Sequence, residues 1–445
     1  MSVRHRRATP AATSEVGEGM GEVVGPGSPE NFRFPRDFLW GAATAAHQVE
    51  GDNRASDWWA AEESGRLPHR SGRACDHLRR YEADFDLARA FGHNAHRLSL
   101  EWSRLEPEPG VRDEAAFAHY ARVLEALRLR GLEPVVTLHH FTVPRWFAER
   151  GGWLAADALD RFAAHVDAVV ERLGRGIRWW ITINEPTVLA KHGWVTGDWP
   201  PFVRGRWDLA FRVIHRLCAA HRRAYRRIHA RLPDALVSFA HSIPWIEPCD
   251  PTRALDRFAA RLRTAFLVDW PFALVREDGR PLLDYLAVNY YTRSLVRWRP
   301  RGRALLFGAD CHAHRHGPRR FDDLGQEVWP VGLLQVLRRV ARLGLPILVT
   351  ENGIATTDDE LRLDHLRGHL EALARALAEG IDLRGYLYWS LMDNFEWAKG
   401  TTARFGLAAT DYATLERRPR PAMRLLAEVA RTGRLVASHR EATRA

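Results

Sequence analysis

Short apolar runs alternate with amphipathic stretches along most of the chain. The runs are rich in β-branched and aromatic side chains and are expected as strands at residues 38–43, 95–100, 134–138, 179–183, 236–241, 285–289, 347–350 and 385–389. Apolar residues recur at helical spacing between and after them, at residues 76–92, 113–131, 156–173, 209–231, 257–268, 328–343, 361–379 and 421–431. This alternation predicts an α/β fold, a single (β/α)₈ TIM barrel with long βα loops at its C-terminal face.

The first 30 residues lie outside this pattern. They are basic at the start and then rich in Gly, Pro, Ser and Glu, without the apolar segment of a secretory signal. We therefore expect a disordered tail at residues 1–30, one barrel domain at 31–435, a short C-terminal tail at 436–445, and a cytoplasmic protein. No apolar run is long enough to span a bilayer, so no membrane association is expected.

The formal net charge of +10 raises the question of a nucleic-acid partner. Lysine occurs only at Lys191 and Lys399, and arginine is scattered over the whole chain rather than gathered in a basic stripe among aromatic residues. No nucleic acid is therefore expected as a partner, and the sequence sets no oligomeric state.

Cysteine usage and cofactor motifs narrow the chemistry. Four cysteines lie far apart in a chain that can build a large core without cross-links, and they are expected as free thiols: Cys75, Cys218, Cys249 and Cys311. The tract from Cys311 to His316 contains three histidines, but a solvated polar loop is favoured over a metal site. Dinucleotide, P-loop and serine-elbow motifs are absent, so no cofactor is expected.

Two glutamates directly follow apolar strands, at the end of a barrel where catalytic groups gather. Glu185 comes after WWITIN and Glu351 after PILVT. A carboxylate at such a crowded position is costly unless it is paired or functional, although two salt-bridged surface glutamates are the alternative. Glycoside hydrolysis needs two carboxyl groups, one beneath the anomeric carbon and one at the leaving oxygen.

Seven segments in order make the chain resemble glycoside hydrolase family 1, from Phe34 to about Arg431. They are FPRDFLWGAATAAHQVEG, NAHRLSLEWSRLEP, VVTLHHFTVPRWF, ITINEP, LAVNYYTR, ILVTENG and GYLYWSLMDNFEWAKGTTARFGL. The resemblance implies a (β/α)₈ barrel and a β-glycosidase that retains configuration. It makes Glu185 the acid/base and Glu351 the nucleophile.

The resemblance also implies roles for residues around this pair. Asn184 would hold the sugar 2-hydroxyl, Trp389 would stack on the sugar ring, and the sugar clamp would comprise Gln48, His140, Glu396 and Trp397. Arg97 and Tyr291 would contact the nucleophile, with Asn289 as a supporting residue. His96 is expected on the other face of its strand. The alternative interpretations are structural. Asn184 would cap the following helix, His140 would be a buried structural histidine, and Trp389 and Trp397 would belong to the core.

Substrate class rests on Glu396, because relatives acting on phosphorylated sugars have a small residue there. Its carboxylate implies a terminal unphosphorylated β-D-glucoside, with β-galactosides and β-fucosides as further candidates. A transglycosylase using the same glutamates and a catalytically silent sugar-binding barrel are the alternatives. The chain departs from the family pattern at Phe141, where tryptophan is usual, at Val331, where an acidic residue is usual, and in the Arg/His-rich segment 297–326.

Overall fold

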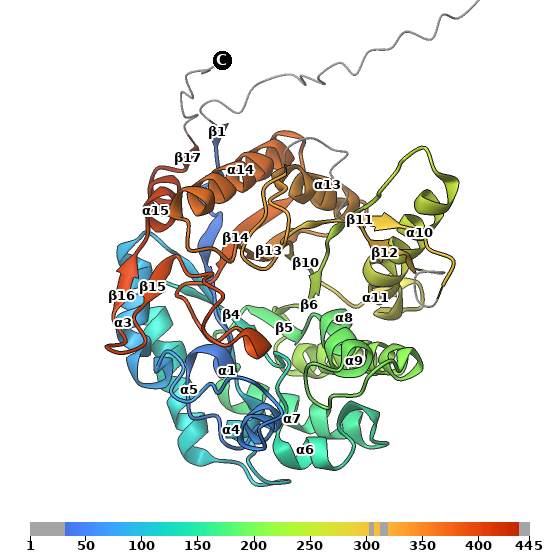
Figure 1. Ribbon diagram of the computed structural model, residues 1–445. Helices are drawn as coiled ribbons and strands as arrows, with labels where there is room; N and C mark the ends of the chain where they lie inside the picture. Colours follow the sequence, from blue (N-terminus) through green and yellow to red (C-terminus); the bar gives the residue numbers. More distant parts are fainter. Residues whose placement is uncertain (1–31, 302–306, 312–318, 436–445) are drawn as a thin grey trace, which may run out of the picture.

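A computed structural model describes residues 32–301, 307–311 and 319–435 and contains the predicted closed barrel (Figure 1). All eight expected strands are confirmed, with ends within two residues of those predicted: β2 (Leu39–Ala43), β3 (Ala95–Ser99), β4 (Glu133–Thr137), β5 (Trp179–Asn184), β6 (Leu236–Ser242), β10 (Leu286–Asn289), β13 (Ile347–Asn352) and β14 (Leu383–Trp389). Neighbouring strands pair in parallel, and β14 pairs with β2 to close the ring.

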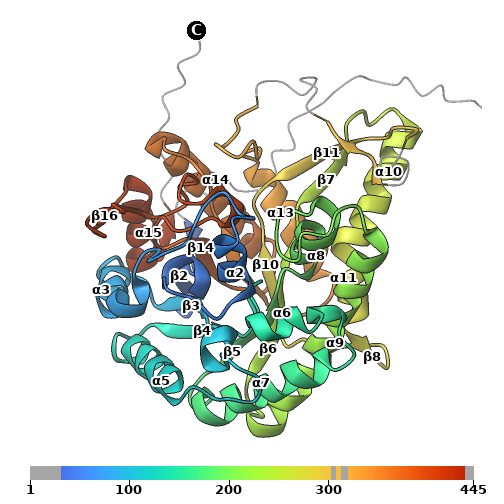
Figure 2. The ribbon, with the colours of Figure 1, turned by 60° about the horizontal axis from the view of Figure 1, so that its bottom comes forward.

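Helices surround the barrel at the positions that the amphipathic stretches predict (Figures 1 and 2). They are α3 (His77–Ala90), α5 (Glu114–Leu129), α7 (Ala158–Leu173), α9 (Trp207–Arg231), α13 (Pro330–Ala341), α14 (Asp359–Ala378) and α15 (Pro421–Thr432). Their starts have recognisable causes. Asp113 accepts a hydrogen bond from the amide of Ala116 at the start of α5, and proline occupies the first turn of α13 and α15.

The single helix expected at 257–268 is wrong in its extent. The chain forms α10 (Ala254–Thr264), a π-helical turn η3 (Ala265–Asp269) and then α11 (Trp270–Leu274) without a break. Pro271 in the first turn of α11 cannot donate a backbone hydrogen bond, and the wider π turn lies directly before it. The spacing of apolar residues does not reveal a change from an α-helix to a π turn.

A small outer sheet stands on the loops beside β6 and β10. It joins β7 (Trp245–Pro248), β11 (Arg293–Arg297) and β12 (Ala309–Asp310), with β11 in the middle. Together with α10 it lies at one edge of the molecule in both views (Figures 1 and 2). No alternation of apolar and polar residues along these segments predicts this sheet.

This sheet overturns the expectation of four free thiols. Cys249 and Cys311 form a disulfide, with Cα atoms 5.9 Å apart, whereas Cys75 and Cys218 are buried free thiols. The backbone amides of the paired cysteines bond to the carbonyls of Val296 and Leu295 on β11, which brings together residues 62 apart in sequence. Cysteines so far apart in the sequence give no indication that they will form a disulfide.

Both ends of the described chain meet in a short ladder. β1 (Phe32–Arg33) pairs antiparallel with β17 (Arg434–Leu435). The tails predicted at residues 1–30 and 436–445 lie outside the described residues, as do His312, His314 and His316 of the polar tract. Within the described ranges no helix is long and apolar enough to cross a membrane, and no group of three potential metal ligands gathers.

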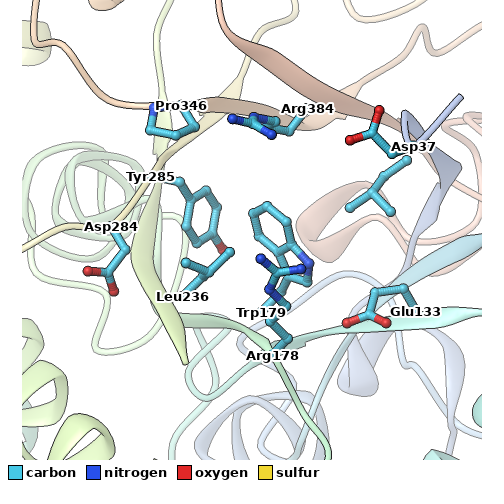
Figure 3. A pocket seen from close by; sticks show the side chains of 10 residues that line it. Asp37, Glu133, Arg178, Trp179, Leu236, Asp284, Tyr285, Pro346 and Arg384 are labelled. Atoms are coloured by element: carbon cyan, nitrogen blue, oxygen red, sulfur yellow. The ribbon is translucent and has the colours of Figure 1, made fainter. Parts of the chain in front are cut away.

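A hollow of about 390 Å³ opens at the amino ends of the strands (Figure 3). Glu133, Arg178 and Tyr285 lie around it, at the starts of their strands. Apolar side chains such as Ile181 and Leu348 fill the barrel interior above it. The hollow is therefore separated from the carboxyl ends of the strands, where Glu185 and Glu351 lie.

Candidate active site

Glu351 is held on both carboxylate oxygens at the end of β13. Arg97 on β3 donates to Oε1 over 2.5 Å, and the hydroxyl of Tyr291, just beyond β10, donates to Oε2 over 2.6 Å. Only 4% of Glu351 is exposed, so the guanidinium supplies the positive charge that a buried carboxylate needs. Burial and the charge of Glu351 raise the pKa of Tyr291 well above its usual value, which keeps the phenol a hydrogen-bond donor.

Arg97 is fixed by more than its ion pair. Its other nitrogens donate to Thr137 Oγ1 (3.1 Å) and Asn184 Oδ1 (2.7 Å), and Nη1 also reaches the carbonyl of Thr350 (3.2 Å). Thr137 and Thr350 lie near the ends of β4 and β13 and were not predicted as site residues. Their only sequence signal is a polar side chain at an inward position near a strand end.

Glu185 follows β5 in a contrasting environment. Asn289 on β10 donates to Glu185 Oε1 over 2.8 Å, and Thr350 donates to Asn289 Oδ1 over 2.6 Å. Burial and the nearby charge of Glu351 raise the pKa of Glu185 to about 8, against the opposing effect of the Asn289 amide. Both burial and this charge favour the protonated form of Glu185. Its φ of 43° is unusual for a residue other than glycine, the kind of backbone strain that clusters at functional sites.

Gln48 and Glu396 lie side by side at the barrel mouth. Gln48, on the short helix α1 (Ala46–Val49), donates through Nε2 to Glu396 Oε2 over 3.1 Å and to the Phe395 carbonyl over 2.9 Å. Its Oε1 is buried and has no partner among the described residues, which leaves an acceptor for a ligand hydroxyl. Burial and the charge of Glu351 raise the pKa of Glu396 to about 8.

Aromatic rings form one wall of the site. The ring of His140 is nearly parallel to those of Trp389 and Trp397, at centroid distances of 5.7 and 6.2 Å. Burial lowers the pKa of His140 well below its usual value, so its ring is neutral, and its Nε2 lies 3.3 Å from Asn184 Nδ2. Phe141 packs against Trp397 at 5.3 Å.

The structure brings every predicted site residue to the carboxyl end of the barrel. His96 points away as alternation predicts, to Thr44 Oγ1 and the ring of Phe85. Val331, on α13, is 48% exposed, so this departure from the family pattern lies on the helix surface. Trp199, which packs against Phe141 and Trp397, is not predicted from the sequence because nothing in its loop marks it as a site residue.

A parallel barrel whose mouth holds one carboxylate paired with a guanidinium and two buried carboxyl groups of raised pKa, flanked by amides and flat aromatic rings, defines a carbohydrate-cleaving enzyme class. The model of Glycosyl hydrolase family 1 matches residues 30–281 and 275–434. The chain belongs to this family and is a glycoside hydrolase acting on O-glycosyl bonds.

Individual relatives agree with this assignment. The chain is 31% identical to Beta-glucosidase A of Thermotoga maritima over 86% of this chain and 95% of that protein. It resembles the solved structure of a beta-glycosidase from Pyrococcus horikoshii with a TM-score of 0.86 and 38% identity, covering 92% and 97% of the two chains. It is also 29% identical to a 6-phospho-beta-galactosidase of Lacticaseibacillus casei, over 86% and 95%.

Proposed function

We propose that the protein is a retaining β-glycosidase that hydrolyses terminal unphosphorylated β-D-glucosides by double displacement. Glu351 is the nucleophile and Glu185 the acid/base. The observation that carries this assignment is the contrast between the two carboxyl groups. Glu351 faces a guanidinium and a phenol, whereas the pKa of Glu185 is raised to about 8.

In the first step Glu351 attacks the anomeric carbon while the bond to the leaving oxygen breaks. Glu185 gives its proton to that oxygen, so the aglycone leaves as a neutral alcohol. Arg97 and Tyr291 hold the two oxygens of Glu351, which fixes the orientation of the attacking group.

In the second step a water molecule attacks the anomeric carbon and the ester bond to Glu351 breaks. Glu185, now ionised, takes a proton from the water. The ester carries no charge, so a main cause of the raised pKa of Glu185 is gone in the intermediate, and the carboxylate becomes available as a base. One side chain can therefore act as acid and then as base.

The sugar clamp supports a neutral glycone. Gln48 and Glu396 offer neighbouring polar atoms for two sugar hydroxyls, and Trp389 and Trp397 offer apolar faces. Burial and the charge of Glu351 raise the pKa of Glu396, and among the described residues it makes no ion pair with an arginine or lysine that could also compensate a sugar phosphate. β-Galactosides differ from glucosides in the configuration at carbon 4, β-fucosides also lack the 6-hydroxyl, and both are further candidate substrates.

The test is a panel of aryl β-glycosides that differ only in the sugar, with the product followed by NMR. Fast cleavage of the glucoside, releasing the β-anomer first, is expected. Release of the α-anomer would exclude the double displacement, and failure to cleave any unphosphorylated sugar in the panel would exclude the proposed substrate class.

A further inference from the structure

Trp199 lies against the aromatic wall of the site, although it comes from a loop well beyond the acid/base. After Glu185 the chain runs through α8 (Pro186–Ala190) and the π-helical turn η2 (Lys191–Thr196) before it reaches Trp199. The indole packs against Phe141 at 5.0 Å and Trp397 at 5.5 Å between ring centroids, and only 7% of the residue is exposed.

The loop holds this indole in a fixed place. The ring of His192 stacks on Trp199 at 4.4 Å, and His192 Nδ1 lies 3.0 Å from the carboxylate of Asp198. The amide of Val203 donates to the Gly193 carbonyl over 2.9 Å, so the loop folds back on η2. A side chain at Gly193 would come within 3.0 Å of the Pro200 carbonyl, so glycine allows this close approach. The position of Trp199 is therefore set before substrate arrives.

The indole nitrogen of Trp199 is an available donor. It makes no hydrogen bond to any residue that the structure describes, and it is not among the fully enclosed polar atoms. Trp58 packs on the same ring at 5.5 Å, but its Nε1 is fully enclosed and has no hydrogen-bond partner within residues 32–301, 307–311 and 319–435. Phe141 stands where tryptophan is usual in the family, and its side chain has no hydrogen-bond donor.

We propose that Trp199 is a specificity-determining residue whose indole N–H donates a hydrogen bond to one sugar hydroxyl on the Phe141 side of the pocket. The indole occupies the space beside the smaller phenyl ring and supplies the donor that Phe141 lacks. This inference rests on the proposed function, because it needs a sugar in the pocket formed by Trp389, Trp397 and Glu396.

The test removes the donor and keeps the ring. Trp199→Phe and wild type are compared on the aryl β-glycoside that wild type cleaves best and on its monodeoxy forms, which lack one hydroxyl at a time. Loss of a neutral hydrogen bond should lower kcat/KM for the parent about 3- to 10-fold. For one monodeoxy substrate, the variant and wild type should be equal within about twofold, since the partner hydroxyl is already gone.

A matched control separates this from a general loosening of the wall. Trp58→Phe removes an enclosed nitrogen beside the same ring. It should change kcat/KM by the same factor for the parent glycoside and for every monodeoxy form. Adding Phe141→Trp to Trp199→Phe should restore discrimination against the same monodeoxy substrate. The proposal would be overturned if Trp199→Phe lowered kcat/KM by the same factor on every substrate, or did not lower it on the parent glycoside. Wild type that cleaves no aryl β-glycoside would instead overturn the proposed function.

Discussion

Asn289 donates a hydrogen bond of 2.8 Å to Glu185, and the same amide lies 3.3 Å from Asn184 Oδ1. Thr350 fixes the other end of the Asn289 side chain, so the donor cannot turn away. A donor to a carboxylate favours its ionised form, whereas burial and the charge of Glu351 favour the protonated form. Asn289 therefore limits how far the pKa of Glu185 rises.

Removing this donor should move the alkaline side of the pH profile. With Glu185 as the proposed acid, activity should need its protonated form and should be lost as pH rises through its pKa of about 8. In Asn289→Ala the pKa rises further, so the alkaline limb of kcat/KM shifts to higher pH, while kcat/KM at pH 7 falls roughly tenfold through looser positioning of Glu185. As a control, the kcat/KM profile of Glu185→Gln on an activated substrate should show no alkaline limb. An unchanged limb in Asn289→Ala would show that another group controls it.

Glu351→Gln should abolish turnover, because the neutral amide cannot form the glycosyl ester. We expect a loss on the order of 10⁴-fold or more in kcat on an activated aryl glycoside. Glu351→Gly should regain activity with azide or formate and give a product of inverted α configuration. Near-normal turnover by Glu351→Gln would contradict the assignment.

Glu185→Ala should affect substrates according to their leaving groups. A poor leaving group needs the proton of Glu185, so kcat/KM should fall roughly 10²- to 10⁴-fold, whereas a dinitrophenyl glycoside should lose far less in the first step. The measurement is a series of aryl glucosides of graded leaving-group pKa. A leaving-group dependence equal to that of wild type would argue against the acid role.

Glu396 should exclude a sugar phosphate. Among the described residues Glu396 makes no ion pair with an arginine or lysine, and a 6-phosphate would be desolvated close to the negative charge of Glu351, the charge that also raises the pKa of Glu396. Aryl β-glucoside should be cleaved and its 6-phospho form should not. The result that decides against this prediction is a higher kcat/KM on the phosphorylated substrate. Glu396→Ser should lose roughly tenfold or more on the neutral glucoside.

The thiol content of the protein tests the outer sheet. Alkylation of the unfolded, unreduced protein should label Cys75 and Cys218 only, and reduction should add Cys249 and Cys311. Cys249→Ser should leave Cys311 open to alkylation without reductant. Loss of the bridge should lower stability by about 2 to 4 kcal/mol, read as a lower Tm. Four labelled cysteines without reduction would contradict the bridge.

The sequence predicts the barrel well because each strand must bury both faces, so its apolar run is nearly continuous. The run at 179–183 becomes β5, and Glu185 follows it at the mouth. The outer sheet escapes prediction because β7 and β11 carry polar residues, such as Glu247 and Arg293, that pair with one another across the sheet. The mixed polar pattern of these two strands is typical of a loop.

The candidate site divides in the same way. Glu185, Glu351 and their named neighbours can be read from strand ends, since parallel strands deliver those positions to one mouth. Trp199 cannot, because its place depends on a π-helical turn and on the His192–Asp198 contact. These are tertiary features without a sequence period.

The ladder between β1 and β17 has a practical consequence. Residue 37, only four positions past β1, lines the hollow at the amino ends of the strands, so the two ends of the described chain, at residues 32 and 435, lie on the side of the barrel away from the carboxylates. A fusion partner or an anchoring tag attached directly at residue 32 or 435 would therefore leave the mouth open to bulky glycosides. Joining residues 32 and 435 by a short linker and opening the chain at an outer loop should yield a circular permutant that keeps the barrel intact.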